Sequence, residues 1–447
     1  MSGQFDQIAK FILDPQVPDD VLRRAALLLT DTLGVAAGAT DLEPGRLARD
    51  FAVDFLAGSA ENSARLLFDG RQASVAGAAF AAATQIDNLD GHDGYNPTKG
   101  HIGCAVVPAL FAFADGRALD GRRALTGLAM AYEVSARAAI ALHATVSDYH
   151  TSGAWNALGV AALGCYLNGA SPVQLREALG IAEYHGPRSQ MMREIAHPSM
   201  LHDGSGMGAL TGSMAALLAM RGFQGAPAIT AEAPEVAQYW ADLGDDWTLL
   251  RNYIKPYPIC RWAHAPLDAL ADLMARHSVT ADQVARLQVN TFAQSAALFP
   301  GMPETTGQAQ YSLAFALAVM LRHGQVAPEH IWGAGLQDAA VAGLIERIEV
   351  CETARHSDRF PAGRWADVVL ELHDGRRFVS GDVHARGGPE APMPAKDIRA
   401  KFDRFAVPTL GESTSNALWQ MQDRLLDPDQ PFDAYAALVY PSRPSQG

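Results

Sequence analysis

Apolar residues recur at helical spacing through the first part of the chain. Between residues 21 and 39, Leu and Ala return every three or four positions, which predicts an amphipathic helix. Ser171, with Pro at the next position and Gln174 three positions on, forms a capping box that predicts a helix start. The small and apolar residues over 207–220 predict a buried helix that packs closely against its neighbours. Few strand signals occur in this half of the sequence.

The pattern changes to alternating apolar and polar positions further along the chain. Leu287, Val289 and Thr291 alternate with polar residues, which is typical of a strand with one buried face. Asp374 and Gly375 form a dipeptide that favours a tight hairpin turn. The elements predicted in this way are strands over 286–292, 345–351, 365–373 and 377–383, with one helix over 308–322 among them.

Helical patterns return from about residue 395. The order of elements predicts a mainly α protein, with a large helical domain formed by both chain ends and a smaller α+β domain inserted into it. We expect the helical domain to cover 1–264, the inserted domain 265–392, and the last helices, 393–447, to rejoin the helical domain.

Composition and charge narrow the functional classes. The chain has 447 residues, of which 49% are hydrophobic and 19% charged, so it can bury a large core. The net charge of −14 argues against nucleic acid and against an anionic membrane surface as partners, but a local basic pocket could still bind a small anion. The longest uncharged run, 151–175, contains Asn156, Asn168 and Pro172, so we expect no membrane span.

The cysteines and the first residues bear on localisation. The four cysteines stand far apart and form no CxxC pair, which favours reduced thiols over a disulfide framework or a zinc knuckle. The first fifteen residues lack the basic segment and apolar stretch of a signal peptide. We therefore expect a cytoplasmic protein.

The densest group of ionisable residues lies between residues 85 and 101. A glycine-broken loop there carries carboxylates, histidines and a lysine that could perturb one another's pKa and transfer protons. A solvated turn that caps the next helix is the alternative. A calcium loop is excluded, because Leu89 and Thr98 occupy ligand positions of the EF-hand pattern. Zinc ligation would need Asp90, His92 and His101, which have no recognised ligand spacing, so we expect no metal.

Three other segments carry candidate residues. His150 precedes the uncharged helix, and His202 precedes a glycine-rich helix start at residues 204–208 that outlines an anion site. Lys255 opens a proline-rich stretch at the boundary of the inserted unit, where clefts tend to form. The basic residues of that stretch could bind carboxylates, or it could be a solvated linker. Tyr311 stands at the start of the helix in the inserted unit. The sequence holds neither a nucleotide-binding glycine loop after a strand nor a GxSxG elbow.

Taken together, these segments resemble the MmgE/PrpD family. The resemblance covers nearly the whole chain and is carried by ALLLTDTLGVAAGA, GHIGCAVVPALFAFADG, YHTSGAWNALGVAALG, GMGALTGSMAALLAMRGFQGAP, YIKPYPICRWAH and AQYSLAFALAVML. It implies a helical domain with an α+β lid, a cytoplasmic homodimer, catalysis without metal or cofactor, and a small anionic polycarboxylate as substrate.

The resemblance also implies roles for individual residues. The catalytic roles that it implies fall on Asp90, His101, His150, Lys255 and Tyr311, and substrate-binding roles fall on Asp93 and His202. The basic and aromatic character of their own segments adds Lys99, Arg261 and His264 as substrate-binding candidates. This sequence departs from the family pattern at three positions. Asp87 stands where the family has His, His92 where it has Asp, and His202 where it has Lys.

The predicted reaction is elimination or decarboxylation beside a carboxylate. Lys255 and Arg261 would stabilise the enolate-like charge, while His101 and His150 would move protons. We therefore expect a cofactor-free lyase, a dehydratase, hydratase or decarboxylase, that acts on a branched di- or tricarboxylate. An epimerase that removes and returns one proton of a dicarboxylate is the first alternative. A binding protein of the same fold without catalytic activity is the second.

Overall fold

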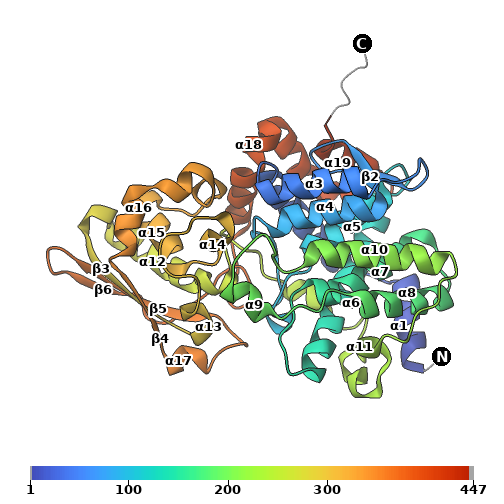
Figure 1. Cartoon of the computed structure of the whole chain (residues 1–447), viewed down its shortest axis with the longest axis horizontal. Coiled ribbons are helices and arrows are strands. Elements are labelled where there is room, and N and C mark those ends of the chain that lie inside the picture. The colour runs from blue at the N-terminus through green and yellow to red at the C-terminus, as the bar shows by residue number, and fades with distance from the viewer. Residues whose placement is uncertain (1–2, 442–447) are drawn as a thin grey trace, which may run out of the picture.

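The computed structural model describes residues 3–441, and Figure 1 shows a helical body beside a smaller unit built on a sheet. The helices and short strands of the body up to the second half of the chain are α1 (Gly3–Leu13), α2 (Asp19–Gly38), α3 (Glu43–Phe55), β1 (Ser63–Arg65), β2 (Gln72–Ser74), α4 (Val75–Asp87), α5 (Gly103–Ala114), α6 (Gly121–Thr145), α7 (Gly153–Asn168), α8 (Pro172–His185), α9 (Met191–Ala196), α10 (Ser205–Met220) and α11 (Ile229–Glu232).

The second unit is built on a mixed sheet with strand order β4-β3-β5-β6, and β7 also pairs with β5. Strands β3 and β4 are parallel, whereas β5 runs antiparallel to β3. Its main elements are α12 (His264–His277), β3 (Val284–Thr291), α13 (Ala293–Ala296), α14 (Thr306–Gln310), α15 (Leu313–His323), α16 (Ala339–Ile345), β4 (Ile348–Glu352), α17 (Ala354–Ser357), β5 (Trp365–Leu372), β6 (Arg377–Val379) and β7 (Val383–His384). The last helices are α18 (Ala395–Met421) and α19 (Phe432–Ala436).

The chain is mainly α, as the hydrophobic pattern predicts. The capping box at Ser171 is present: the hydroxyl accepts a hydrogen bond from the Gln174 amide, and the Gln174 side chain accepts one from the Ser171 amide. Helix α18 packs along α2, far away in the sequence, and buries Phe402 in the core of the body. A second core lies under the sheet and includes Val35 and Phe405 from the body, so the two parts share buried apolar side chains.

Two predicted elements are wrong in detail. The helix predicted over 308–322 is broken, because Ser312 caps a new helix by accepting a hydrogen bond from the amide of Phe315. Tyr311 therefore lies in the break between α14 and α15. The strand predicted over 377–383 is divided into β6 and β7 at Gly381, whose φ of +72° interrupts the extended backbone.

Helix α6 is the one single helix of residues 3–441 that is long and apolar enough to cross a membrane by length and composition. Of its most apolar window, 89% is buried inside the protein, as in the core helix of a helical body.

Candidate active site

A small cavity lies between the helical body and the sheet unit. Its volume is about 20 Å³, which is room for about one water molecule. Residues from both parts line it: Asp90, Lys99, His101, Tyr149, Met191, Asp203, Tyr253, Cys260, Arg261, Trp262, Tyr311 and Arg364. Five of the residues predicted from the sequence are among them, namely Asp90, Lys99, His101, Arg261 and Tyr311.

Asp90 and Lys255 form a buried ion pair at this cavity. The Lys255 ammonium donates to the Asp90 carboxylate and, at 3.0 Å, to the Asp90 carbonyl oxygen. Burial raises the pKa of Asp90 to about 6, although Lys255 opposes the rise. Burial acts to lower the pKa of Lys255, but Asp90, Tyr253 and Cys260 together raise that pKa above its ordinary value. The second Asp90 oxygen, Oδ2, has no hydrogen-bond partner among the described residues.

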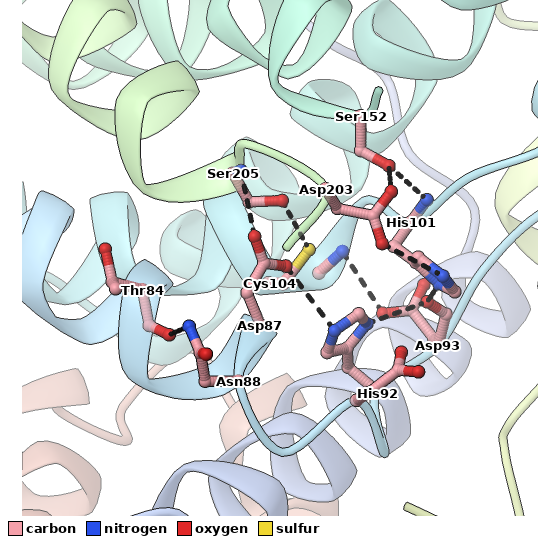
Figure 2. Close-up of polar contacts among 12 residues, drawn as sticks. Thr84, Asp87, Asn88, His92, Asp93, His101, Cys104, Ser152, Asp203 and Ser205 are labelled. Atoms are coloured by element: carbon pink, nitrogen blue, oxygen red, sulfur yellow. Dashed lines mark hydrogen bonds and ion pairs between the residues drawn. The ribbon is translucent and has the colours of Figure 1, made fainter. Parts of the chain in front are cut away.

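His101 is held by main-chain and side-chain bonds from three segments (Figure 2). Its Nδ1 lies 2.8 Å from the Asp93 carbonyl oxygen, which can only accept, so Nδ1 carries the proton and Nε2 has a free lone pair. The His101 amide donates to Ser152 Oγ at 3.0 Å, and Ser152 Oγ donates to Asp203 Oδ1 at 2.8 Å. The other Asp203 oxygen lies 3.5 Å from His101 Nε2. Burial and then Lys255 lower the pKa of His101 well below its ordinary value, so the ring is neutral and can act as a base.

Asp93 supports this loop from behind the cavity. Its carboxylate accepts hydrogen bonds from the amide of Gly103 (3.1 Å), the hydroxyl of Tyr132 (3.1 Å) and the side-chain amide of Asn252 (2.6 Å). A Cβ atom at residue 103 would lie only 2.2 Å from Asp93 Oδ1, so the close approach requires glycine. The carboxylate thus binds groups of its own chain and does not line the cavity, contrary to the expected contact with substrate.

Three cationic side chains face the cavity. The Arg261 guanidinium lies 4.2 Å from the ring centre of Tyr253 and donates to the carbonyl oxygens of Arg386 and Ala385 at 2.6 and 2.9 Å. Burial lowers the pKa of Arg261 to about 10, which leaves it charged at neutral pH. Arg364, from the start of β5, is buried as well, whereas Lys99 is only partly so. These charges suit a substrate with several carboxylates.

Tyr311 reaches the cavity from the break between α14 and α15. Its hydroxyl donates to the Glu194 carboxylate, which lies on α9 of the body. Burial, followed by the nearby Glu194, raises the pKa of Tyr311 well above its ordinary value. Tyr311 is therefore a protonated donor that links the two parts of the protein at the cavity.

The cavity excludes the other three predicted histidines. His150 lies near the surface of the body, where its amide donates to His143 Nε2 at 3.2 Å and the two rings stack. His264 begins α12, and its Nε2 lies 3.0 Å from the Ile259 carbonyl oxygen inside the core. His202 is buried beside Tyr311 but lines a neighbouring pocket. Each of these histidines lies within a motif of the sequence, but the motif does not determine whether its ring faces the cavity.

The structure adds lining residues that the sequence did not single out. Asp203 follows His202 in the glycine-rich segment, and Tyr149 precedes His150, so each stands beside a predicted residue. Arg364 directly precedes strand β5, and Tyr253 stands two residues before Lys255. No sequence pattern around either residue predicts that it lines a cavity.

Two groups of side chains near the cavity have ligand atoms within 4.8 Å of one another: Asp90, His92 and His101, and Asp87, His92 and Cys104. In the first group the ammonium of Lys255 sits on the Asp90 carboxylate and would repel a metal ion. Metal-independent activity therefore stays a prediction, which removal of metal can test.

Comparison with known proteins covers both parts of the chain. The MmgE/PrpD N-terminal domain matches residues 6–242, and the MmgE/PrpD C-terminal domain matches residues 257–427. A cis-aconitate decarboxylase of Aspergillus terreus (strain NIH 2624 / FGSC A1156) is 23% identical over 93% of this chain and 91% of its own length. A second cis-aconitate decarboxylase of Aspergillus terreus is 23% identical over 92% of this chain and 91% of its own length. The chain therefore belongs to the MmgE/PrpD family.

Proposed function

We propose that the protein is a lyase that acts on a small branched di- or tricarboxylate without a cofactor. One observation carries this proposal: a neutral histidine, His101, faces a buried cavity that three cationic side chains and a protonated tyrosine also line. The cations match a polyanionic substrate, and the free Nε2 of His101 matches a base for a carbon-bound proton. The cis-aconitate decarboxylases that resemble the chain support the lyase class.

In the dehydration form of the proposal, His101 Nε2 takes the proton from the carbon beside a carboxylate. The electron pair of that C–H bond forms the new double bond as the C–O bond breaks. Arg261 and Arg364 hold the carboxylate on which negative charge gathers. Tyr311 donates its proton to the leaving oxygen, so that water departs. When the product leaves, solvent takes the proton from His101 and returns one to Tyr311.

The same groups fit decarboxylation. A carboxylate leaves as carbon dioxide, and the electron pair of the broken C–C bond remains on carbon beside a second carboxylate. The cations stabilise that charge, and Tyr311, the protonated donor at the cavity, then delivers a proton to the carbon and regains one from solvent.

The cavity must open for either reaction, because a volume of about 20 Å³ is smaller than a polycarboxylate. The body contributes Asp90, Lys99 and His101, whereas the sheet unit contributes Tyr311 and Arg364. We propose that residues 265–392 act as a lid that separates from the body to admit substrate and then excludes water.

An activity screen over methylcitrate, the aconitate isomers and iminodisuccinate tests the proposal. We expect turnover of at least one compound, loss of that turnover in Lys255→Ala, and no loss in Lys396→Ala, which changes an exposed lysine of α18. Tight binding measured by calorimetry without turnover would instead favour a catalytically silent binding protein.

Epimerisation is the second candidate, because His101 and Tyr311 both face the same cavity and could exchange protons with opposite faces of one carbon. Conversion of one stereoisomer of iminodisuccinate to its diastereomer, without formation of an alkene or carbon dioxide, would establish it.

We also propose that the partner is a second copy of the chain. Helix α3 exposes Leu47, Phe51 and Phe55, and Phe55 is 73% exposed, which is unusual for a row of apolar side chains on one helix. Light scattering should give the mass of a dimer for the natural chain and that of a monomer for Phe55→Glu.

A further inference from the structure

A second, larger pocket lies next to the catalytic cavity. Its volume is about 680 Å³, and it lies among α4, α9, α10 and the segment that joins α9 to α10. Figure 2 shows Asp87 and Asn88, which line this pocket, at the end of α4, with the Asp203 segment nearby. Five apolar side chains stand in its lining among polar ones, and most of the lining surface is apolar: Phe80, Pro187, Met200, Leu201 and Met207.

Side chains in direct contact separate the two spaces. Glu194 lines the pocket, and its carboxylate accepts the hydrogen bond of Tyr311, which lines the catalytic cavity. The ring centre of His202, in the pocket, lies 5.4 Å from that of Tyr311. Asp203 faces the cavity, while its two chain neighbours face the pocket. A shift of α9 and the following segment would therefore join the two spaces.

Two buried side chains of the pocket have polar atoms without a hydrogen-bond partner. His202 is 4% exposed, and neither of its ring nitrogens has a hydrogen-bond partner among residues 3–441. Thr151 is also 4% exposed, and its hydroxyl has no partner there either. Leaving such groups unsatisfied costs about 1–3 kcal/mol each. His202 lies beside Tyr311, where pocket and cavity meet, so the polar end of a ligand that spans both spaces would relieve the cost at this ring.

We propose that this pocket is the second compartment of the substrate site, and that the substrate carries an apolar substituent of several carbons which the pocket holds. The inference rests on the proposed function, since the carboxylates are assigned to the cationic cavity. That cavity has no room for an alkyl chain, whereas the adjoining pocket offers Phe80, Met200 and Met207 as apolar contacts. We therefore expect a polycarboxylate whose alkyl substituent is longer than a methyl group.

Binding of unreactive probes tests this inference. The 2-alkylsuccinates from methyl to hexyl carry two carboxylates and no leaving group, so calorimetry reports their affinity alone. Each methylene that enters the pocket should lower the Kd about fourfold. Met207→Glu, which places a charge in the pocket, should abolish this gain with chain length. Met214→Glu is the matched control, because Met214 lies two turns along the same helix with almost the same exposure but outside the pocket.

The natural protein and Met214→Glu should keep the fourfold steps, with both variants of the same mass by light scattering. A Kd that does not change with chain length would overturn the inference, as would equal steps in Met207→Glu and the natural protein. Fourfold steps in a protein that turns over no polycarboxylate would leave the pocket assignment intact and remove the proposed reaction instead.

Discussion

Two buried lysine–aspartate pairs hold the same loop of this protein, and they differ in how fully their atoms are bonded. Lys401 of α18 donates to both oxygens of Asp31 on α2, at 2.8 and 2.7 Å, and to the carbonyl oxygen of Gly91 at 2.7 Å. Lys255 donates to the carboxylate and the carbonyl oxygen of Asp90, one residue earlier in that loop. The Lys401 pair has an acceptor for every ammonium proton, whereas Asp90 keeps one oxygen unpartnered at the cavity.

We propose that this difference in bonding separates a structural ion pair from a catalytic one. The Lys401–Asp31 pair is fully bonded and does not line the catalytic cavity. It ties the chain ends together, since α18 and α2 are distant in the sequence. A pair that leaves an oxygen open at a cavity can act on a ligand, at the cost of a polar atom without a partner. The first pair is therefore structural in our account, and the second catalytic.

The largest expected effect is that of Lys401→Met on stability. Asp31 would remain buried without its cation, so the free energy of unfolding should fall by about 3–5 kcal/mol. Urea unfolding followed by circular dichroism measures it. Replacing both partners, as in Asp31→Leu with Lys401→Met, should recover most of that loss. If Lys401→Met and the double variant lose the same free energy of unfolding, the pair is not a structural ion pair.

Lys255→Met should instead lower kcat/KM by about 10²–10³-fold, the range for a group that stabilises transition-state charge. Its loss of stability should be smaller than that of Lys401→Met, because Lys255 bonds one carboxylate oxygen and one carbonyl, whereas Lys401 bonds both oxygens of Asp31 and a carbonyl. Steady-state kinetics and urea unfolding on the same sample separate the two effects. If Lys255→Met unfolds at the same urea concentration as Lys401→Met and keeps its activity, the Lys255 pair is structural rather than catalytic.

Tyr311→Phe tests the cavity from the lid side. Loss of one hydrogen bond made in the transition state should lower kcat by about 10²-fold with little loss of stability. Tyr435→Phe is a matched control, because this tyrosine is also fully buried but its hydroxyl bonds Thr30, at 2.8 Å, far from the cavity. Natural kcat in Tyr311→Phe would show that the lid assignment is wrong.

The value of kcat/KM should fall as the pH is lowered through about 6, which gives the pH profile an acid limb. Asp90 loses its charge there, whereas His101, with a pKa well below its ordinary value, is still a neutral base. The pKa of Asp90 lies above its ordinary value of 3.8, so the folded protein binds this proton more tightly than the unfolded chain. Protonation of Asp90 therefore favours folding, and the limb reports lost activity rather than unfolding.

Removing Lys255 should move that limb to higher pH, because the lysine lowers the pKa of Asp90. The logarithm of kcat/KM plotted against pH for the natural protein and Lys255→Met measures the shift. An unchanged limb in the variant would mean that another group titrates.

Metal removal should have the smallest effect of all. Dialysis against a chelator should leave kcat/KM unchanged within error, because Lys255 already occupies the Asp90 carboxylate. Loss of activity that one divalent cation restores would contradict this, and would make Asp90 a ligand rather than the partner of Lys255.

The sequence predicted much of the fold because local rules and packing agree there. Ser171 caps its helix, and Val289 alternates between polar neighbours to give a strand with one buried face. The break at Tyr311 was missed because the apolar pattern runs through it, and only the Ser312 cap interrupts the backbone.

The sequence pointed to those cavity-lining residues that lie together in one loop. It missed residues that only the folding of distant segments brings to the cavity. Asp90 and His101 come from a loop whose composition marks it. Arg364 reaches the cavity only because β5 begins beside the body, which is a tertiary contact without a local pattern. His150 lies in a conspicuous segment, yet its ring stacks on His143 rather than facing the cavity.

Proton NMR of the reaction in heavy water tests the central claim most directly. The natural protein should convert a methylcitrate or aconitate isomer to an alkene product or to carbon dioxide, and His101→Asn should do so about 10³-fold more slowly, within the range for loss of a general base. Exchange of the α-proton without net loss of substrate, or full activity in His101→Asn, would contradict a lyase that uses this histidine as its base.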